Sequence, residues 1–182
     1  NSPYRCWYDF GPQYKGGYRS WWGFETLPEV NEETPSYVEF ITGPGGVIDT
    51  WLRRGAAGFR LDVADELPDE FIEKVRAAVK RVSPEKFLLG EVWEDATTKF
   101  GFNKRRTYLL GKGLDSVMNY PFKNAVLDFV KGKPAEQAMT EILTICEHYP
   151  APAMDTALNF LSTHDTERAL TVIADEPANG RG

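Results

Sequence analysis

The stretch GAAGFRLDVADE, residues 55–66, is a short apolar segment that ends in acidic residues. Side chains alternate across a strand, so a strand here would place Phe59 and Leu61 on one face and Arg60 and Asp62 on the other. Burying two charges is costly unless they pair and hydrogen-bond. We therefore expect a buried ion pair between Arg60 and Asp62, which either fixes the register of the strand or belongs to an active site.

The composition is that of a soluble globular protein. The 182 residues are 42% hydrophobic and 26% charged, and this length suffices for one domain with a core of its own. The sequence holds no apolar run that could cross a membrane, so we expect no membrane partner. A formal net charge of −6 argues against a nucleic-acid partner, because phosphate binding needs a basic surface. Cys6 and Cys146 are expected to be free thiols, and the compartment stays open.

The N-terminal part of the sequence is aromatic and irregular. The chain starts at Asn1 without Met and inside this segment, so we expect it to be an excerpt of a longer protein. Residues 1–28 mix many Trp, Tyr and Phe side chains with Gly and Pro, without a helical or strand period. Such a loop either stacks on sugar rings or forms a small core of its own.

Helices and strands alternate along the rest of the chain. We expect strands over 57–62, 87–90, 114–120 and 157–162, helices over 36–41, 47–54, 68–82, 122–130 and 134–147, a loop with a short helix in 94–113, and a frayed tail from Asp175. The strands are apolar runs rather than alternating patterns, which favours a parallel sheet covered on both faces.

Three of the four expected strands end in a carboxylate: Asp62, Glu91 and Asp165. In parallel barrels the catalytic groups sit at the C-terminal ends of the strands, so residues far apart in sequence converge on one site. Core packing gives no reason to place an acid there repeatedly. The pattern therefore favours an active site at this edge of the sheet.

Paired carboxylates can carry out glycoside hydrolysis, one as nucleophile and one as general acid, while a third binds the sugar. The nucleophile must stay ionised beside a cation, and Arg60 is that cation for Asp62. Glu91 lies in the apolar run FLLGEVW and is the group expected to carry the proton. Three acids can also bind a divalent metal, but the nearby Arg60 makes a metal site less favourable.

Three motifs carry a family resemblance: GFRLDVADE, LLGEVW and FLSTHDTER. In order and spacing they resemble signature motifs of the alpha-amylase family, glycoside hydrolase family 13. The resemblance implies that Asp62 is the nucleophile, Glu91 the general acid/base, and Asp165 a third carboxylate that holds sugar hydroxyls and stabilises the oxocarbenium-like transition state. Arg60 would orient Asp62, and His164 would contact hydroxyls of the sugar undergoing reaction.

The resemblance also implies a reaction. The family retains anomeric configuration through a covalent glycosyl-enzyme, which requires the carboxyl groups of Asp62 and Glu91 to lie about 5 to 5.5 Å apart. The expected activity is cleavage of α-1,4-glucosidic bonds in maltooligosaccharides, cyclodextrins, starch or pullulan. The alternatives are a 4-α-glucanotransferase, an α-1,6 debranching enzyme, and a non-catalytic amylase-like domain that only binds.

Finer detail points to one subgroup. DVADE resembles the DVANE form of cyclomaltodextrinases, neopullulanases and maltogenic amylases, in which the acid at Glu66 lies towards the leaving-group side. Asp65 replaces the commoner Asn, and simple acidity at a helix N-terminus would explain Asp65 and Glu66 equally well. Trp93 and Tyr120 are expected to line the substrate pocket, although either could belong to the core.

The implied fold is part of a (β/α)8 TIM barrel, with segments that resemble its fourth to seventh strands. Residues 1–35 would be the tail of a domain B-like excursion and residues 36–182 a partial catalytic barrel. An open barrel exposes edge strands and an apolar face, so we expect a homo-oligomer or low stability, and weak or no activity of this excerpt alone. No cofactor and no metal-ligand cluster is expected in this chain, although calcium is possible in a full-length enzyme.

Overall fold

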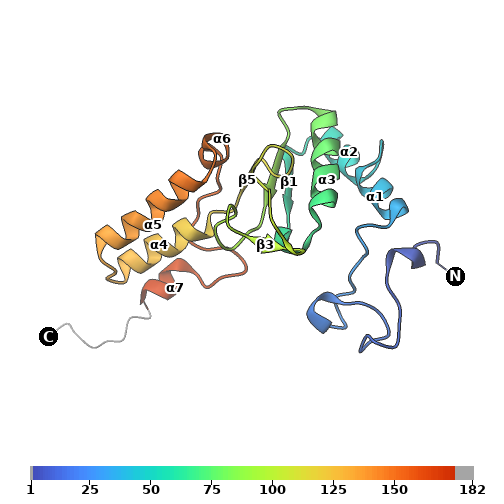
Figure 1. Cartoon of the computed structure of the whole chain (residues 1–182), viewed down its shortest axis with the longest axis horizontal. Helices are drawn as coiled ribbons and strands as arrows, with labels where there is room; N and C mark the ends of the chain where they lie inside the picture. The colour runs from blue at the N-terminus through green and yellow to red at the C-terminus, as the bar shows by residue number, and fades with distance from the viewer. Residues whose placement is uncertain (1, 175–182) are drawn as a thin grey trace. The chain divides into compact units, whose positions relative to one another are not determined.

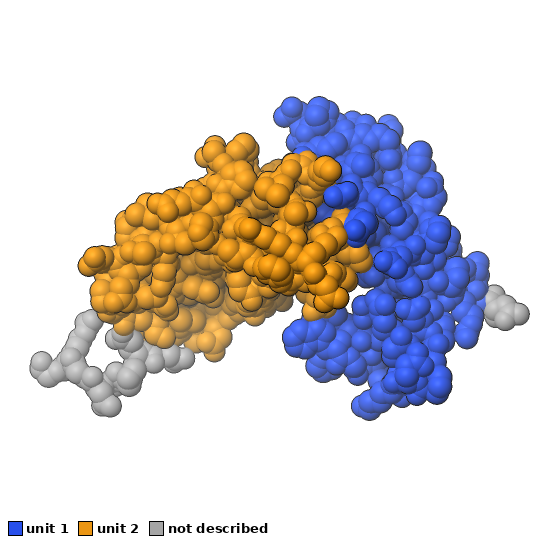
Figure 2. All heavy atoms as spheres, in the orientation of Figure 1, with its two compact units in different colours: residues 1–58, 70–86 blue, residues 59–69, 87–182 orange. Residues whose placement is uncertain are grey.

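The computed structural model describes residues 2–174; the tail expected to be frayed lies outside them. The chain forms two compact units, one made of residues 1–58 and 70–86 and the other of residues 59–69 and 87–182 (Figure 2). This division differs from the boundary expected between residues 35 and 36, which stays a prediction.

The first unit contains the aromatic segment and three helices (Figure 1). The helices are α1 (Pro35–Thr42), α2 (Val47–Arg53) and nearly all of α3 (Asp69–Val82). Helix α3 follows Pro68 and carries the basic residues Lys80 and Arg81 in its last turn, which suits the negative end of the helix dipole. Its expected apolar stripe is buried at Phe71, Ile72, Val75, Ala78 and Val79.

The aromatic segment is folded by turns and isolated pairs rather than by long strands. It contains two short 3-10 turns, η1 (Arg5–Trp7) and η2 (Trp21–Gly23). Its antiparallel bridges join Tyr8 to Val30, Phe10 to Tyr18, and Ser20 to Pro28. The absence of a strand period in this part of the sequence agrees with this irregular structure.

The second unit is built on a three-stranded sheet with the order β1-β2-β5. The strands are β1 (Gly58–Leu61), β2 (Phe87–Gly90) and β5 (Ser116–Val117). Strands β2 and β5 are parallel, with Leu89 opposite Ser116 and Gly90 opposite Val117. The expected bounds of β2 are confirmed, whereas β5 is much shorter than the expected strand over 114–120.

The expected strand over 157–162 does not form. Only Leu158 pairs with the sheet, through an isolated parallel bridge to Met118. The next two side chains make lateral contacts instead: the Asn159 amide oxygen accepts a hydrogen bond from Asn119, and the Phe160 ring packs edge-on against a tyrosine of the core. An apolar run thus indicates burial here but not a strand.

The region 94–113 contains a small hairpin in place of the expected short helix. Strand β3 (Phe100–Gly101) pairs antiparallel with β4 (Lys104–Arg105). Between them Phe102 and Asn103 both have positive φ, 52° and 60°, as a two-residue hairpin turn of type I′ requires. The sequence Phe-Asn lacks the glycine that normally signals such a turn, so the hairpin was not predicted.

Helices complete the second unit. They are α4 (Tyr120–Val130), α5 (Ala135–His148), α6 (Ala151–Asp155) and α7 (Ala169–Ala174). Helices α4 and α5 lie side by side in Figure 1 and are joined by a short connection. The longest helices of the described part, α3 and α5, have 14 residues, and none there is long and apolar enough to cross a membrane.

Candidate active site

The Arg60 guanidinium lies among the three carboxylates that the sequence singled out. Its Nη1 forms an ion pair with Asp62 Oδ1. Its Nη2 lies 3.1 Å from Glu91 Oε2 and 3.9 Å from Asp165 Oδ2, and the Nε donates to Met118 Sδ at 3.4 Å. Nη2 is buried and has no hydrogen bond of good geometry, so its contact with Glu91 is an ion pair rather than a hydrogen bond.

The expected ion pair between Arg60 and Asp62 forms, but the expectation that it is buried is wrong. The Asp62 side chain is 74% exposed and that of Arg60 is 27% exposed, whereas Glu91 is only 4% exposed. Strand β1 ends at Leu61, so strand alternation no longer sets the direction of the next side chain. The buried carboxylate of the site is therefore Glu91, and the accessible one is Asp62.

The expected apolar setting of Glu91 is wrong for the carboxylate itself. Oε1 accepts hydrogen bonds from Trp93 Nε1 at 3.0 Å and Tyr120 Oη at 3.4 Å. Oε2 accepts from the Val63 backbone N–H at 2.8 Å and also faces Arg60. A buried carboxylate is costly unless it is hydrogen-bonded and paired, and Glu91 satisfies both conditions.

The turn after β1 supplies one of these donors through an uncommon backbone conformation. Val63 has φ 43° and ψ 52°, in the left-handed region. A β-branched residue rarely adopts this conformation, and strained residues of this kind cluster at functional sites. Sequence reasoning missed Val63, because a valine gives no signal of a left-handed turn.

The segment that carries His164 and Asp165 is organised by local hydrogen bonds. The Thr163 N–H donates to Thr166 Oγ1 at 2.9 Å, and the Asp165 N–H donates to Thr163 Oγ1 at 3.3 Å. His164 Nε2 lies 3.1 Å from Asp165 Oδ2, and its side chain is 74% exposed. Both predicted side chains are thus accessible to a ligand.

Trp93 and Tyr120 stack with their centroids 4.3 Å apart, but they differ in exposure. Trp93 is 43% exposed and Tyr120 is 1% exposed. Burial raises the pKa of Tyr120, while a side-chain hydrogen bond with Thr163 acts to lower it. Tyr120 therefore packs against one face of Trp93 and stays protonated, so that it can donate its hydrogen bond to Glu91. Trp93 offers an exposed ring on which a sugar can stack.

Asp65 and Glu66 lie on the 3-10 turn η3 (Ala64–Glu66), before α3 begins. Glu66 is exposed. Asp65 accepts a hydrogen bond from Tyr108 Oη at 2.8 Å and pairs with Lys99 Nζ at 2.9 Å. Burial, followed by this hydrogen bond, raises the pKa of Tyr108. Asp65 is thus tied to the loop after β2, a role that simple acidity at a helix N-terminus does not describe.

The described residues contain no group of three or more His, Cys, Asp or Glu side chains that could hold a metal ion. The carboxylates of the site face a guanidinium, which is a poor neighbour for a cation. The carboxylates around Arg60 therefore do not fit calcium, and calcium in a full-length enzyme stays a prediction. Cys6 and Cys146 are free thiols, as expected, and both are exposed.

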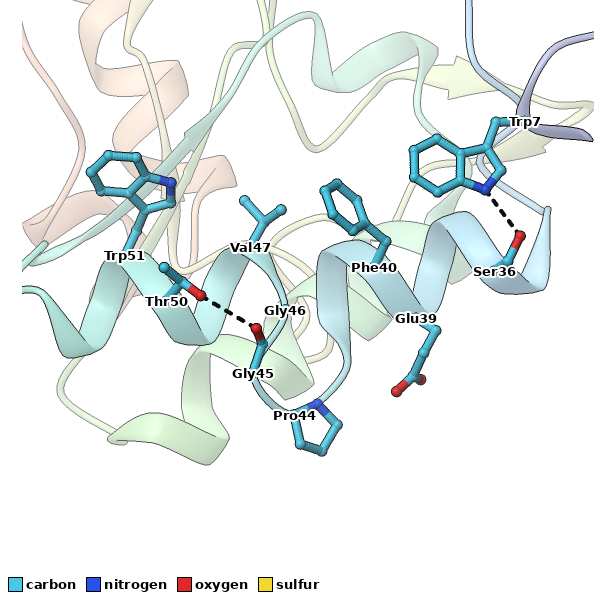
Figure 3. A pocket seen from close by; sticks show the side chains of 10 residues that line it. All are labelled: Trp7, Ser36, Glu39, Phe40, Pro44, Gly45, Gly46, Val47, Thr50 and Trp51. Carbon is cyan, nitrogen blue, oxygen red and sulfur yellow. Dashed lines mark hydrogen bonds between the residues drawn. The ribbon is translucent and has the colours of Figure 1, made fainter. Parts of the chain in front are cut away.

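A separate hollow of about 540 Å³ lies in the first unit (Figure 3). Trp7, Phe40, Val47 and Trp51 point to one side of α1 and α2 around it, and Trp7 Nε1 donates to Ser36 Oγ at 2.9 Å. None of its lining residues is a predicted site residue. The hollow is therefore not the site formed by the strand-end carboxylates.

Residues 13–180 match the family model described as the alpha amylase catalytic domain. The chain belongs to this family. It is 35% identical to an amylopullulanase of Thermoanaerobacter thermohydrosulfuricus, over 99% of the chain and 13% of that protein. It is 36% identical to a cyclomaltodextrinase of a Bacillus species, over 81% of the chain and 25% of that protein. The family resemblance inferred from the three motifs is thereby confirmed.

The solved structures agree with this assignment. The ligand-free cyclic α-maltosyl-(1→6)-maltose hydrolase of Arthrobacter globiformis superposes with a TM-score of 0.84 at 27% identity, covering 97% of the chain and 39% of that enzyme. The expected fold, part of a (β/α)8 barrel, is confirmed, as is the enzyme class of the family, glycoside hydrolase. The chain thus spans a small part of these relatives, and the individual roles of its site residues stay predictions.

Proposed function

We propose that this chain carries the active site of a retaining α-glucan hydrolase. The observation that carries the proposal is the single guanidinium of Arg60 in contact with Asp62, Glu91 and Asp165. These residues come from three separate segments, two of which directly follow strands of one sheet. A structural ion pair needs one partner, whereas glycoside hydrolysis needs two carboxylates on one bond and a third to hold the sugar.

The reaction proceeds in two displacements. In the first, an Asp62 oxygen attacks the anomeric carbon while Glu91 donates a proton to the departing glycosidic oxygen, which leaves a covalent glycosyl ester on Asp62. In the second, Glu91 takes a proton from water, and the water oxygen replaces Asp62 at the anomeric carbon. Two inversions return the starting configuration. The exposure of Asp62 suits an attacking group, and the burial of Glu91 keeps bulk water away from its carboxyl group.

The neighbours of these two carboxylates have supporting roles. Arg60 orients Asp62 and balances its charge, and Asp165 and His164 bind sugar hydroxyls through their exposed polar atoms. Trp93 provides a ring for stacking on a sugar face. Glu66 lies on the leaving-group side, and Tyr120 holds the Glu91 carboxylate from behind.

The substrates follow from the relatives by analogy. The names of two relatives refer to cyclic or branched glucans, a cyclomaltodextrinase and a cyclic α-maltosyl-(1→6)-maltose hydrolase. We propose α-1,4-linked glucans as substrates. An α-1,6 debranching activity is the second candidate, favoured by the 1→6 linkage in the name of a structural relative.

Product analysis tests this function. The chain is incubated with maltohexaose, β-cyclodextrin and pullulan, and the products are separated by chromatography beside an Asp62→Asn control. Short maltooligosaccharides that vanish in the control support an α-1,4 hydrolase, and proton NMR should show the α-anomer as the first product. Maltotriose alone from pullulan would favour α-1,6 cleavage, longer oligosaccharides would indicate glucan transfer, and binding without products would indicate a non-catalytic domain.

A further inference from the structure

Two loops of the second unit are locked together by one buried arginine. Arg106 lies directly after β4, and its side chain is 1% exposed. Its guanidinium donates to the carbonyl oxygens of Asp65 at 2.7 Å and Leu67 at 2.6 Å, and more weakly to that of Ala64 at 3.4 Å. Its Nε donates to Asp69 Oδ1 at 2.7 Å. Three of these acceptors lie in the short turn that follows Asp62 and Val63, and the fourth, Asp69, is the first residue of α3.

The same turn needs an external restraint. Val63, with φ 43°, precedes the three carbonyl groups that Arg106 binds. A left-handed β-branched residue persists only where its surroundings hold it in place. The Arg106 guanidinium is planar and presents its donors in a fixed fork, so it fixes the direction of several carbonyl groups at once. The turn after β1 is therefore held from the loop after β2.

The conformation of Val63 determines what its N–H can reach. That N–H donates to Glu91 Oε2 at 2.8 Å, and the next N–H, of Ala64, donates to the Glu91 carbonyl at 3.1 Å. If Val63 relaxed to negative φ, the direction of this peptide group would change and Glu91 would lose a backbone donor. The link from Arg106 to the Glu91 carboxylate therefore runs through Val63, while Ala64 contacts only the Glu91 backbone carbonyl.

We propose that Arg106 is a positioning residue for the general acid/base: it holds the 64–69 turn so that Val63 keeps its left-handed conformation and its hydrogen bond to Glu91. This inference rests on the proposed function, because it assigns Arg106 a part in the reaction that Glu91 performs. Arg106 itself touches no reacting atom.

The first test measures hydrogen exchange of single amides by NMR. In Arg106→Gln we expect the Val63 N–H to exchange at least about tenfold faster, while the Met118 N–H, bonded to Gly90 O at 3.0 Å within the sheet, keeps its protection. Arg106→Lys keeps the charge without the fork and should show the same pattern. The matched control is Arg105→Gln, since the neighbouring exposed Arg105 donates to Thr97 O instead.

The second test is rescue. Glycine adopts positive φ without strain. In the double variant Arg106→Gln/Val63→Gly, the N–H of residue 63 should therefore regain its protection from exchange. The double variant should also recover at least about a tenth of the turnover that Arg106→Gln loses relative to the parent. A role limited to stability would give no rescue, because glycine would loosen the turn further. Two outcomes would overturn the proposal. One is that the Met118 and Val63 amides both lose protection in both Arg106 variants. The other is that the Val63 amide exchanges in Arg106→Gln at the same rate as in the Arg105→Gln control.

The two readouts separate this inference from the proposed function. Hydrogen exchange needs no substrate, so the link from Arg106 to Val63 is measured even in a chain that cleaves no glucan. Turnover that falls in Asp62→Asn but not in Arg106→Gln would confirm the hydrolase and contradict the positioning role.

Discussion

The turn after β1 and the segment around His164 both present a predicted catalytic carboxylate, but they are held in different ways. The turn after β1 is fixed by side chains from a distant loop, chiefly the buried Arg106. The segment 163–166 is organised mainly by hydrogen bonds among its own residues, with a 3.9 Å ion pair from Arg60 to Asp165. The position of Asp62 relative to Glu91 is thus fixed by contacts with a segment distant in sequence. The position of Asp165 depends mainly on contacts within its own short segment.

The largest effect on turnover is expected from Asp62, in the turn that Arg106 holds. Asp62→Asn should lower turnover by at least about 10³-fold, because an amide is a poor nucleophile and the lost group forms the covalent bond. The measurement is the initial rate of maltohexaose cleavage. Asp155→Asn, an exposed acid at the end of α6, is the control and should keep the parent rate. Equal rates in both variants would refute the assignment of Asp62.

Arg60 joins the two regions, so its replacement should affect both. Arg60→Lys keeps a positive charge but loses the fork that contacts three carboxylates, and we expect turnover to fall by about 10²-fold. The free energy of unfolding should also fall by about 2 kcal/mol, because the buried Glu91 loses its guanidinium partner. Urea denaturation and initial rates measure the two effects. A variant with reduced stability but unchanged turnover would make the arginine purely structural.

A pair of smaller changes tests the contrast directly. Thr166→Val removes the acceptor of the Thr163 N–H, and we expect a KM about tenfold higher because little else holds the Asp165 segment. Tyr108→Phe removes one hydrogen bond to Asp65 and should change KM less than about threefold, since Lys99 and Arg106 remain. Steady-state kinetics on maltohexaose decide between them. The reverse order of effects would show that the comparison is wrong.

The smallest effect concerns stability against pH. Burial acts to raise the pKa of Asp95, but hydrogen bonds from His148 and Thr97 outweigh it and lower this pKa below its ordinary value. A depressed carboxyl pKa stabilises the fold above about pH 4 and loses this contribution as the pH falls through the folded-state pKa. Asp95→Asn should therefore lose less stability than the parent protein as the pH falls from about pH 5 through the folded-state pKa of Asp95.

The measurement is urea denaturation of both proteins across this pH range. Asp155→Asn is again the exposed control and should keep the parent slope. An unchanged slope in Asp95→Asn would show that the contact between Asp95 and His148 contributes nothing to stability in solution.

The sequence predicted those features that depend on local pattern. The apolar run Phe87–Gly90 became β2 with its expected bounds, and the stripe of α3 is buried as its 3.6-residue period required. The three acids stood out because each follows an apolar run. Family resemblance then supplied the barrel, which four apolar segments alone would not have specified.

The features that the sequence could not predict depend on contacts between distant segments. The exposure of Asp62 depends on where β1 ends, and the run 157–162 fails to form a strand because only Leu158 pairs. Arg106 lies in the run Lys-Arg-Arg, which is typical of a solvated surface, yet its side chain is almost fully buried. Its partners are more than thirty residues away in sequence, so no local pattern distinguishes it from the exposed Arg105.

Covalent trapping would identify directly which carboxylate is the nucleophile. The chain is incubated with 5-fluoro-α-D-glucosyl fluoride, whose ring fluorine slows both displacements while the leaving fluoride favours the first, so a glycosyl ester accumulates even when turnover is slow. Peptide mass spectrometry then locates the label. We expect one sugar on Asp62 and none in Asp62→Asn. A label on another carboxylate of the folded chain would contradict the assignment of Asp62 as the nucleophile.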